Sequence, residues 1–203
     1  MRAHWQQVYE TKPDSALSWH RASSGMSLDL IRAAPADPTT PVIDVGGGAS
    51  VLVDDLLAAG YSDVTVLDIS EAALGRARLR LAERASQAAW IVGDVCRWAP
   101  PRRWAVWHDR AVFHFLTDAV GQDTYLAALA AGTTADATAI FATFAPDGPE
   151  RCSGLPVQRY DAEALARRLG RGFRLVAERR ETHVTPWGAE QRFCYATLRR
   201  VTA

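Results

Sequence analysis

Cysteine is scarce in this chain, and its placement excludes two kinds of small-domain scaffold. The three cysteines, Cys96, Cys152 and Cys194, are far apart in the sequence, and no Cys-x-x-Cys pair occurs. An odd number of widely spaced cysteines predicts neither a disulfide framework nor a structural zinc site, so we expect no bound metal. Free thiols persist in a reducing environment, and we therefore expect the protein to be cytoplasmic.

The chain also lacks a charge excess and a long apolar run. Its 23 basic and 23 acidic side chains give a formal net charge of zero, which argues against a general nucleic-acid binder. No uncharged apolar run approaches the roughly 18 residues of a membrane helix, and residues 1–10 lack the basic and apolar blocks of a secretory signal. We expect neither nucleic acid nor a membrane as a partner, and a monomer or homodimer.

Hydrophobic residues make up 48% of the 203 residues, which is enough for the core of one domain over residues 1–203. Residues 1–34 carry aromatic side chains among polar ones, which predicts one or two short helices. A proline-rich stretch, residues 35–41, then separates this N-terminal segment from a core over residues 41–203.

Strand-like and helix-like segments alternate through most of the core, which predicts a parallel sheet covered by helices. Five strands are expected at residues 42–45, 64–68, 90–92, 104–107 and 138–144. Helices are expected after Ser50, from Ser70 to about Glu83, at 124–131 and after Asp161. Residues 173–185 and 191–199 are two further strand-like runs, joined by hairpin-type residues. The predicted fold class is α/β: a single doubly wound, mostly parallel seven-stranded sheet with an antiparallel C-terminal hairpin and an N-terminal helical lid.

A glycine-rich turn follows the first predicted strand and opens the first helix of the core. In Asp44-Val45-Gly46-Gly47-Gly48, glycine allows the backbone to turn tightly and approach a ligand at the carboxyl edge of a parallel sheet. The dinucleotide fingerprint needs a third glycine where this chain has Val51, and no Gly-Lys-Ser/Thr follows as in a phosphate loop. The turn therefore predicts a nucleotide-like ligand other than NAD, FAD or ATP.

Acidic residues at the ends of the next two strands extend this site. Asp68 ends the second strand about 20 residues beyond the glycines, where a carboxylate can accept hydrogen bonds from both hydroxyls of a ribose. Asp94 follows the third strand and belongs to the same edge. Three acidic positions at one sheet edge favour a ligand with a nucleoside part.

With these motifs, the sequence resembles the class I S-adenosylmethionine-dependent methyltransferases, a family with a seven-stranded Rossmann-like fold. The resemblance covers roughly residues 40–200, and the predicted hairpin agrees with the antiparallel seventh strand of that family. It implies S-adenosyl-L-methionine as the cofactor and methyl transfer as the activity. The positions that it implies for cofactor binding are Asp44, Gly46, Gly47, Gly48, Asp68, Ile69, Asp94 and Val95.

A second resemblance is to the branch that contains seven-strand lysine methyltransferases of elongation factors. It rests on the N-terminal aromatic segment and on Gly60-Tyr61-Ser62-Asp63. Those enzymes continue from strand four with an Asp-Lys-Gly type sequence, whereas this chain has Asp109-Arg110-Ala111. This departure argues against a protein substrate, and protein lysine N-methylation is kept as the alternative to a small acceptor. A module that binds S-adenosylmethionine without turnover is the alternative from another functional class.

Polar side chains cluster in residues 107–115, at the predicted exit of the fourth strand, where an acceptor would meet the cofactor. The candidate catalytic residues are His108, Asp109, Arg110 and His114. A histidine or aspartate could take a proton from the acceptor, and Arg110 could hold an anionic acceptor or the cofactor carboxylate. The structural alternative is an ion pair of Asp109 with Arg110 and histidines that cap chain ends. Because a sulfonium methyl is already reactive, alignment without a base is the favoured mechanism.

Four residues are candidates for contact with the acceptor. Trp5, Tyr9 and Trp19 of the helical lid would form a closed apolar pocket, and Cys152 lies in a turn-rich loop. Ordinary core packing of the aromatics and an inert thiol are the alternatives. The family motif Asn-Pro-Pro-Tyr/Phe, which grips amino groups of bases or amides, is missing after the fourth strand. The favoured function is methyl transfer to a small thiol, amine or hydroxyl acceptor by in-line displacement.

Overall fold

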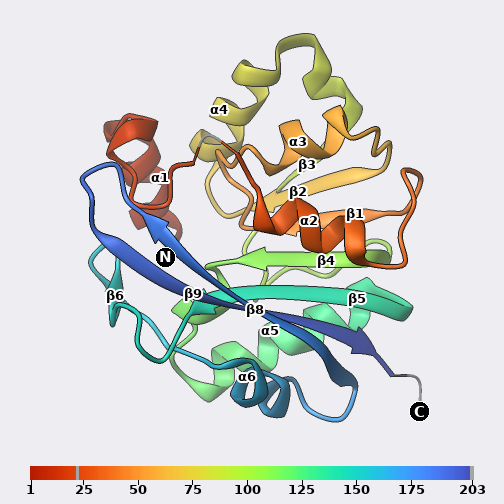
Figure 1. Cartoon of the computed structure of the whole chain (residues 1–203). Helices are drawn as coiled ribbons and strands as arrows, with labels where there is room; N and C mark the ends of the chain where they lie inside the picture. The colour runs from red at the N-terminus through yellow and green to blue at the C-terminus, as the bar shows by residue number, and fades with distance from the viewer. Residues whose placement is uncertain (22, 202–203) are drawn as a thin grey trace.

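The structure is a computed structural model that describes residues 1–21 and 23–201. Seven strands form one sheet in the order β3-β2-β1-β4-β5-β9-β8 (Figure 1). Their bounds are β1 Val42–Val45, β2 Val64–Asp68, β3 Ala88–Val92, β4 Trp104–Arg110, β5 Thr133–Phe144, β8 Phe173–Val184 and β9 Glu190–Arg200. β1 to β5 run parallel, whereas β9 is antiparallel to both β5 and β8. The predicted α/β fold with an antiparallel C-terminal hairpin is confirmed.

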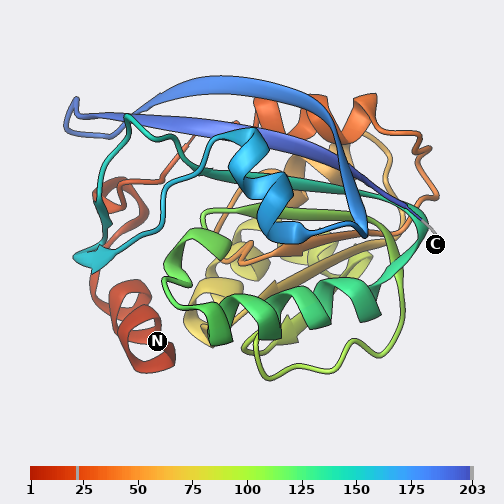
Figure 2. The same cartoon turned by 90° about the horizontal axis from the view of Figure 1, so that it is seen from below.

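Helices cover both faces of the sheet. The α-helices of the described residues are α1 Arg2–Thr11, α2 Met26–Ala33, α3 Leu52–Ala58, α4 Glu71–Leu81, α5 Ala119–Gly132 and α6 Ala162–Leu169. α2, α3 and α4 contribute Ile31, Leu56 and Leu74 to the apolar cluster on one face. α5 and α6 contribute Leu129 and Leu165 to the cluster on the other. Figure 2 shows α2 and α5 on opposite sides of the sheet. No helix within residues 1–21 and 23–201 has the length and apolar content needed to cross a membrane.

The N-terminal segment lies outside these two layers. α1 packs against α4, where Val8 and Tyr9 form a small apolar cluster with Ala73. A short 3-10 helix at Asp14–Ala16 follows, and the chain then reaches α2. Figure 1 shows α1 on the same side of the molecule as the tip of the β8–β9 hairpin. The prediction of short helices before the core is confirmed.

Local sequence signals set several helix boundaries. The predicted caps Ser70 and Asp161 accept hydrogen bonds from the backbone N–H groups three residues ahead, at 3.2 and 2.6 Å. α5 begins before the predicted residue 124, because Asp118 caps it in the same way at 2.8 Å. A small two-stranded ladder lies in a stretch predicted as loop, with bounds β6 Arg151–Cys152 and β7 Leu155–Pro156.

β4 differs from its prediction in a way that matters for the site. It extends to Arg110, three residues beyond the predicted end, and pairs with β1 so that Asp44 is opposite His108 and Val45 is opposite Asp109. Successive side chains of a strand point to opposite faces of the sheet. His108 and Asp109 therefore belong to different sides, and the prediction of one polar cluster at the strand exit is wrong.

Candidate active site

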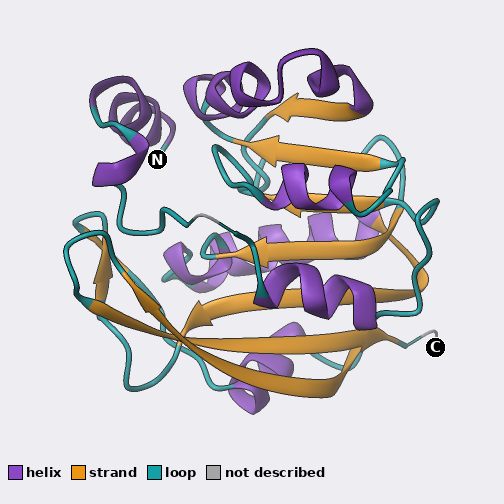
Figure 3. Ribbon diagram, turned by 45° about the horizontal axis from the view of Figure 1, so that its top comes forward, coloured by secondary structure: helices purple, strands orange, loops and turns teal. Residues whose placement is uncertain are grey.

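A cavity of about 310 Å³ lies at the carboxyl edge of the parallel strands. Its walls include the loops after β1, β2 and β3, the end of β4, and parts of the N-terminal segment. Figure 3 shows α1 on the side to which the parallel strands point. Open α/β sheets bind ligands in the crevice beyond the carboxyl ends of their strands. The volume also fits small-molecule sites, which span roughly 300 to 1,000 Å³.

The turn after β1 requires glycine at two successive positions. At Gly46 the backbone is left-handed, with φ of +69°, and an added Cβ would lie 1.9 Å from Val112 Cγ2. At Gly47 an added Cβ would lie 2.5 Å from Asp44 Oδ2. Because no side chain fits here, the turn presents bare backbone to the cavity and forms a cradle for a ligand.

Asp68 ends β2 with its carboxylate buried beside the cavity. Its Oδ1 accepts a hydrogen bond from Ser70 N at 2.7 Å, and the backbone N–H groups of Ile69 and Gly48 also support the carboxylate. Burial raises the pKa of Asp68 to about 7, far above its ordinary value of 3.8. A carboxylate can accept more hydrogen bonds than these three N–H groups supply, so Asp68 has room for a ribose hydroxyl of S-adenosylmethionine.

Most of the predicted cofactor positions lie on the cavity wall. Asp94 Oδ1 accepts a hydrogen bond from Cys96 N at 3.0 Å, which shapes the turn after β3. Gly48 lies just behind the wall, next to Asp68. The positions that line the cavity are Asp44, Gly46, Gly47, Asp68, Ile69, Asp94 and Val95. The structure thus brings acidic groups from three neighbouring strand ends to one half of the cavity.

His108 borders this half, with both ring nitrogens engaged. Nδ1 lies 2.7 Å from Asp44 Oδ1, and Nε2 lies 3.0 Å from Ser27 Oγ. All three side chains are buried, and all three residues line the cavity. With the Nδ1 proton donated to Asp44, Nε2 accepts the hydroxyl proton of Ser27, which is the order of contacts in a Ser-His-Asp triad. His108 therefore has no free nitrogen for an acceptor, whereas Ser27 keeps oxygen lone pairs.

Two predicted catalytic residues are not brought to the cavity. Asp109 is fully buried on the other face, where it accepts hydrogen bonds from Tyr125 Oη at 2.5 Å and Val112 N at 2.9 Å. Burial raises the pKa of Asp109 to about 6. Among the described residues it forms no ion pair with Arg110, so that structural alternative is also wrong. Asp109 instead holds the turn after β4, where Ala111 has a left-handed φ of +68°.

His114 is the second of these residues. It is fully buried, and its Nδ1 accepts a hydrogen bond from Phe144 N at 3.4 Å. Burial and then the charge on Arg110 lower the pKa of His114 to about 3, so the ring is neutral at ordinary pH. Its contacts are those of a core residue that supports the segment after β4.

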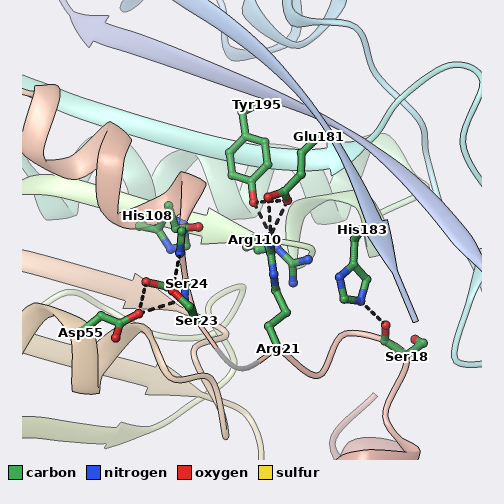
Figure 4. Close-up of polar contacts among 12 residues, drawn as sticks. Ser18, Arg21, Ser23, Ser24, Asp55, His108, Arg110, Glu181, His183 and Tyr195 are labelled. Atoms are coloured by element: carbon green, nitrogen blue, oxygen red, sulfur yellow. Dashed lines mark hydrogen bonds and ion pairs between the residues drawn. The ribbon is translucent and has the colours of Figure 1, made fainter. Parts of the chain in front are cut away.

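Arg110, at the end of β4, is linked through side chains to the far strands (Figure 4). Its Nε donates to Tyr195 Oη at 3.2 Å, and Tyr195 Oη donates to Glu181 Oε2 at 3.1 Å. Glu181 also accepts two hydrogen bonds from Arg21, at 2.8 and 2.6 Å. The guanidinium carbon of Arg110 lies 4.5 Å from the centroid of the Phe193 ring. Because Arg21, Arg110 and Phe193 line the cavity, this network forms its wall on the side of β8 and β9.

Three contacts hold the segment between α1 and α2 against the core (Figure 4). Ser24 N and Oγ donate to Asp55 Oδ2 at 2.9 and 2.6 Å. His183 Nε2 lies 2.6 Å from the carbonyl oxygen of Ser18. The pair that Arg21 makes with β8 is the third contact. The segment is thereby fixed to α3 on one side of the cavity and to β8 on the other.

Aromatic side chains from this N-terminal region complete the wall. The ring centroids of Trp5 lie 5.5 Å from Trp19 and 5.1 Å from Phe115, and Trp19 Nε1 donates to Tyr9 Oη at 3.1 Å. Cys152 is buried nearby, and burial raises the pKa of its thiol to about 11, which keeps it protonated at neutral pH. The predicted substrate residues Trp5, Tyr9, Trp19 and Cys152 all line the cavity.

Several wall residues have only weak signals in the sequence. Phe193 and Tyr195 are two residues apart in the last strand, and the two-residue period of a strand predicts that they point to the same face of the sheet. Arg21 and Ser27 belong to no motif, and their partners lie 160 and 81 residues away along the chain. Tertiary folding alone brings these two residues to the site.

Comparisons with known proteins bear on both the fold and the activity. Residues 42–133, from β1 to the first residue of β5, match the family model described as a methyltransferase domain. The comparison with curated protein sequences finds no match.

Solved structures share the fold along almost the whole chain. One is 1,6-didemethyltoxoflavin-N1-methyltransferase from Burkholderia thailandensis with bound S-adenosylhomocysteine, at TM-score 0.76 and 20% identity over 99% of this chain and 87% of that one. Another is the N-methyltransferase NodS from Bradyrhizobium japonicum, at TM-score 0.72 and 16% identity over 96% and 97%. A third, from work on the conversion of a disulfide bond into a thioacetal group during echinomycin biosynthesis, has TM-score 0.79 and 19% identity over 99% and 93%.

The family match covers the segment that carries the glycine turn, Asp68 and Asp94, which are the residues that fit the cofactor. The strand order and the antiparallel hairpin agree with the same class of fold. The chain thus carries a class I S-adenosylmethionine-dependent methyltransferase domain, with S-adenosyl-L-methionine as its methyl donor.

Proposed function

We propose that this methyltransferase acts on a small nucleophilic acceptor, a thiol, amine or hydroxyl compound. The observation that carries the proposal is the set of aromatic side chains, Trp5, Trp19 and Phe115, that line the cavity beside the strand ends. A concave, mostly apolar wall suits a molecule of a few heavy atoms, whereas a folded protein substrate needs an open rim. Residues 1–34 act as a helical lid in this proposal. Two structures of similar fold are those of a toxoflavin-type N1-methyltransferase and an N-methyltransferase, which agrees with such acceptors.

The half of the cavity with the acidic strand ends is called the cofactor half. Its residues hold and orient the methyl donor. S-adenosylmethionine, when bound, supplies a methyl group on a sulfonium, which is transferred by in-line displacement. Asp68 accepts hydrogen bonds from the ribose hydroxyls, and Asp94 and Val95 bound the adenine side. The backbone of the glycine turn lies against the donor. The contribution of these groups to the rate is alignment of the two reactants.

His108 adds a route for a proton when the acceptor carries one. The acceptor gives its proton to Ser27 Oγ as the hydroxyl proton of Ser27 moves to His108 Nε2. Asp44 then stabilises the imidazolium through Nδ1. An acceptor that ionises readily needs only alignment.

The test is incubation of the protein with methyl-labelled S-adenosylmethionine, in one arm with a cell lysate and in the other with its low-mass filtrate. Label in a small compound from the filtrate is the expected result. Label retained on one protein band would overturn the small-acceptor proposal in favour of protein lysine methylation. Tight binding of S-adenosylhomocysteine in calorimetry without transfer in either arm would favour a binding module, and NAD and ATP serve as control ligands.

A further inference from the structure

We propose that the acceptor carries a carboxylate or a comparable anionic group, and that Arg110 binds it. The inference deepens the proposed function and rests on it. It starts from the Arg110 side chain, which has five N–H donors and uses only the one on Nε for a protein partner. Within the described residues Nη2 is buried and has no hydrogen-bond partner, and Nη1 makes no hydrogen bond either. A half-buried guanidinium with free donors is costly unless a ligand satisfies it.

The half of the cavity next to β8 and β9, with Arg21, Arg110 and Phe193, is called the acceptor half. The charges around Arg110 leave it with a net positive charge. Glu181 is the carboxylate of the network, and Arg21 already holds it by two hydrogen bonds. Against the effect of burial, Arg21 and then Arg110 lower the pKa of Glu181, but two guanidinium groups share this one carboxylate, so the network keeps a net positive charge. The charge on Arg110 acts on its surroundings, because after burial it lowers the pKa of both His114 and His183. An anion at this place would gain a charge-assisted hydrogen bond.

The direction in which Arg110 is held separates the acceptor from the cofactor. The side chains proposed to bind the cofactor, Asp68 and Asp94, lie at the ends of β2 and β3. Arg110 instead bonds to Tyr195 of β9 and, through it, contacts β8. Along the sheet these are opposite sides of β1 and β4. Figure 4 shows Arg110 beside Tyr195, which in turn contacts Glu181. We therefore assign Arg110 to the acceptor rather than to the carboxylate of the cofactor.

The wall around Arg110 indicates the rest of the acceptor. Phe193 lies against the guanidinium at 4.5 Å and keeps the planar fork in one orientation. Trp5, Trp19 and Phe115 line the same cavity. The matching acceptor is a flat or apolar molecule with one anionic group, such as an aromatic carboxylate that also bears the nucleophile.

Calorimetry with benzoate and benzamide tests the assignment, because these probes have nearly the same shape and differ in charge. Both are titrated into protein saturated with S-adenosylhomocysteine, using wild type, Arg110→Gln and, as control, Arg174→Gln. Arg174 is exposed on β8 outside the cavity. We expect wild type to bind benzoate at least tenfold more tightly than benzamide. The preference should fall to within twofold in Arg110→Gln and persist in Arg174→Gln.

Three outcomes would overturn the assignment. The first is equal behaviour of the two probes with wild type, including no detectable binding of either. The second is a benzoate preference that survives Arg110→Gln. The third is a tenfold loss of S-adenosylhomocysteine affinity in Arg110→Gln, which would give Arg110 to the cofactor. If Arg110→Gln does not fold, Arg110→Lys keeps the charge without the planar fork and should retain only part of the preference. Failure of wild type to bind S-adenosylhomocysteine would instead contradict the proposed function.

Discussion

The two halves of the cavity carry opposite charge and are built in different ways. The cofactor half presents carboxylates at the ends of β1, β2 and β3, supported mainly by backbone N–H groups a few residues away. The acceptor half presents Arg21 and Arg110 among aromatic rings, joined by side-chain contacts between distant parts of the chain. A cationic sulfonium donor suits the first half, and an anionic acceptor suits the second. The difference shows how one cavity can direct a cationic and an anionic ligand to different halves by charge alone, before specific hydrogen bonds form.

The largest effect should come from closing the cradle of the cofactor half. Gly46→Ala places a methyl group in a left-handed backbone position and against Val112. We expect the affinity for S-adenosylhomocysteine to fall by about a hundredfold or more, a loss of about 2.7 kcal/mol. Gly75→Ala in α4, where an added Cβ meets nothing within 4 Å, is the control and should leave affinity unchanged. Calorimetric affinity within tenfold of wild type would contradict the role of the turn.

The proposed proton transfer through Ser27 and His108, at the border between the two halves, can be tested by substitution. With an acceptor of high pKa, His108→Asn and Ser27→Ala should each slow single-turnover methyl transfer by ~10², while S-adenosylhomocysteine affinity stays the same. Ser23→Ala, at another serine of the cavity wall, should keep the wild-type rate. Rates within a few-fold of wild type for both variants would mean that Ser27, His108 and Asp44 only help to align the reactants.

A pH titration sharpens the role of Asp68. The pKa of this carboxyl is about 7 in the free protein, and ribose donors favour its ionised form, so binding releases a proton below pH 7. Affinity for S-adenosylhomocysteine should therefore rise with pH up to about 7, by at most about tenfold per pH unit, and then level off. Asp68→Asn should flatten the curve and weaken binding at pH 8 at least ~10-fold. The exposed Asp29→Asn control should reproduce the wild-type curve.

The same carboxyl should lower the stability of the ligand-free protein at neutral pH. Its folded pKa of about 7 lies above the unfolded value near 3.8, so the native state binds more protons between these values. Its contribution to stability is present below about pH 4 and is lost as pH rises to about 7. Asp109, with its pKa of about 6, acts in the same direction, so the comparison is between wild type and Asp68→Asn. At pH 8 the variant should be more stable by about 1–3 kcal/mol in urea unfolding, and equal stability would contradict the burial of a charge.

The smallest effect concerns the contact that ties the acceptor half together. Arg21 and Glu181 have side-chain exposures of 21% and 13%, and a double-mutant cycle should give a coupling of about 1–2 kcal/mol. The exposed pair of Arg167 with Glu163, at 69% and 79%, is the control and should couple by less than about 0.5 kcal/mol. S-adenosylhomocysteine affinity should stay within threefold in all variants. Equal coupling in the two pairs would remove the argument that Arg21 is the main partner of Glu181.

The sequence predicted the cofactor half well because its signals are local. Asp68 ends a β-branched run and precedes the Ser70 cap, so strand, carboxylate and helix are read within seven residues. The parallel sheet and its antiparallel end follow from the βα alternation and the final hairpin, whereas the strand order comes from the structure. Local signals fail at Asp118. The helix that it caps, α5, is only weakly amphipathic, so its first turn gives no clear pattern and the sequence predicts α5 too short.

The acceptor half was predicted only in part because its geometry is tertiary. The extension of β4 decides that His108 points to the cavity and Asp109 to the opposite core, and one-dimensional clustering cannot show this alternation. Trp5, Tyr9 and Trp19 were found as aromatics of the first segment, but nothing near them indicated Glu181 or His183 as partners of the same segment. Contacts over such separations follow from the completed sheet.

The contacts between the segment that follows α1 and strand β8 also bear on the order in which the site can form during synthesis. Ser18 and Arg21 are synthesised 165 and 160 residues before their partners His183 and Glu181. Contacts of this separation form late, since the loop that they close must wait for the intervening chain. The cofactor strands β1 to β3 are complete by residue 92, so a nascent chain can form the donor cradle long before its acceptor wall exists.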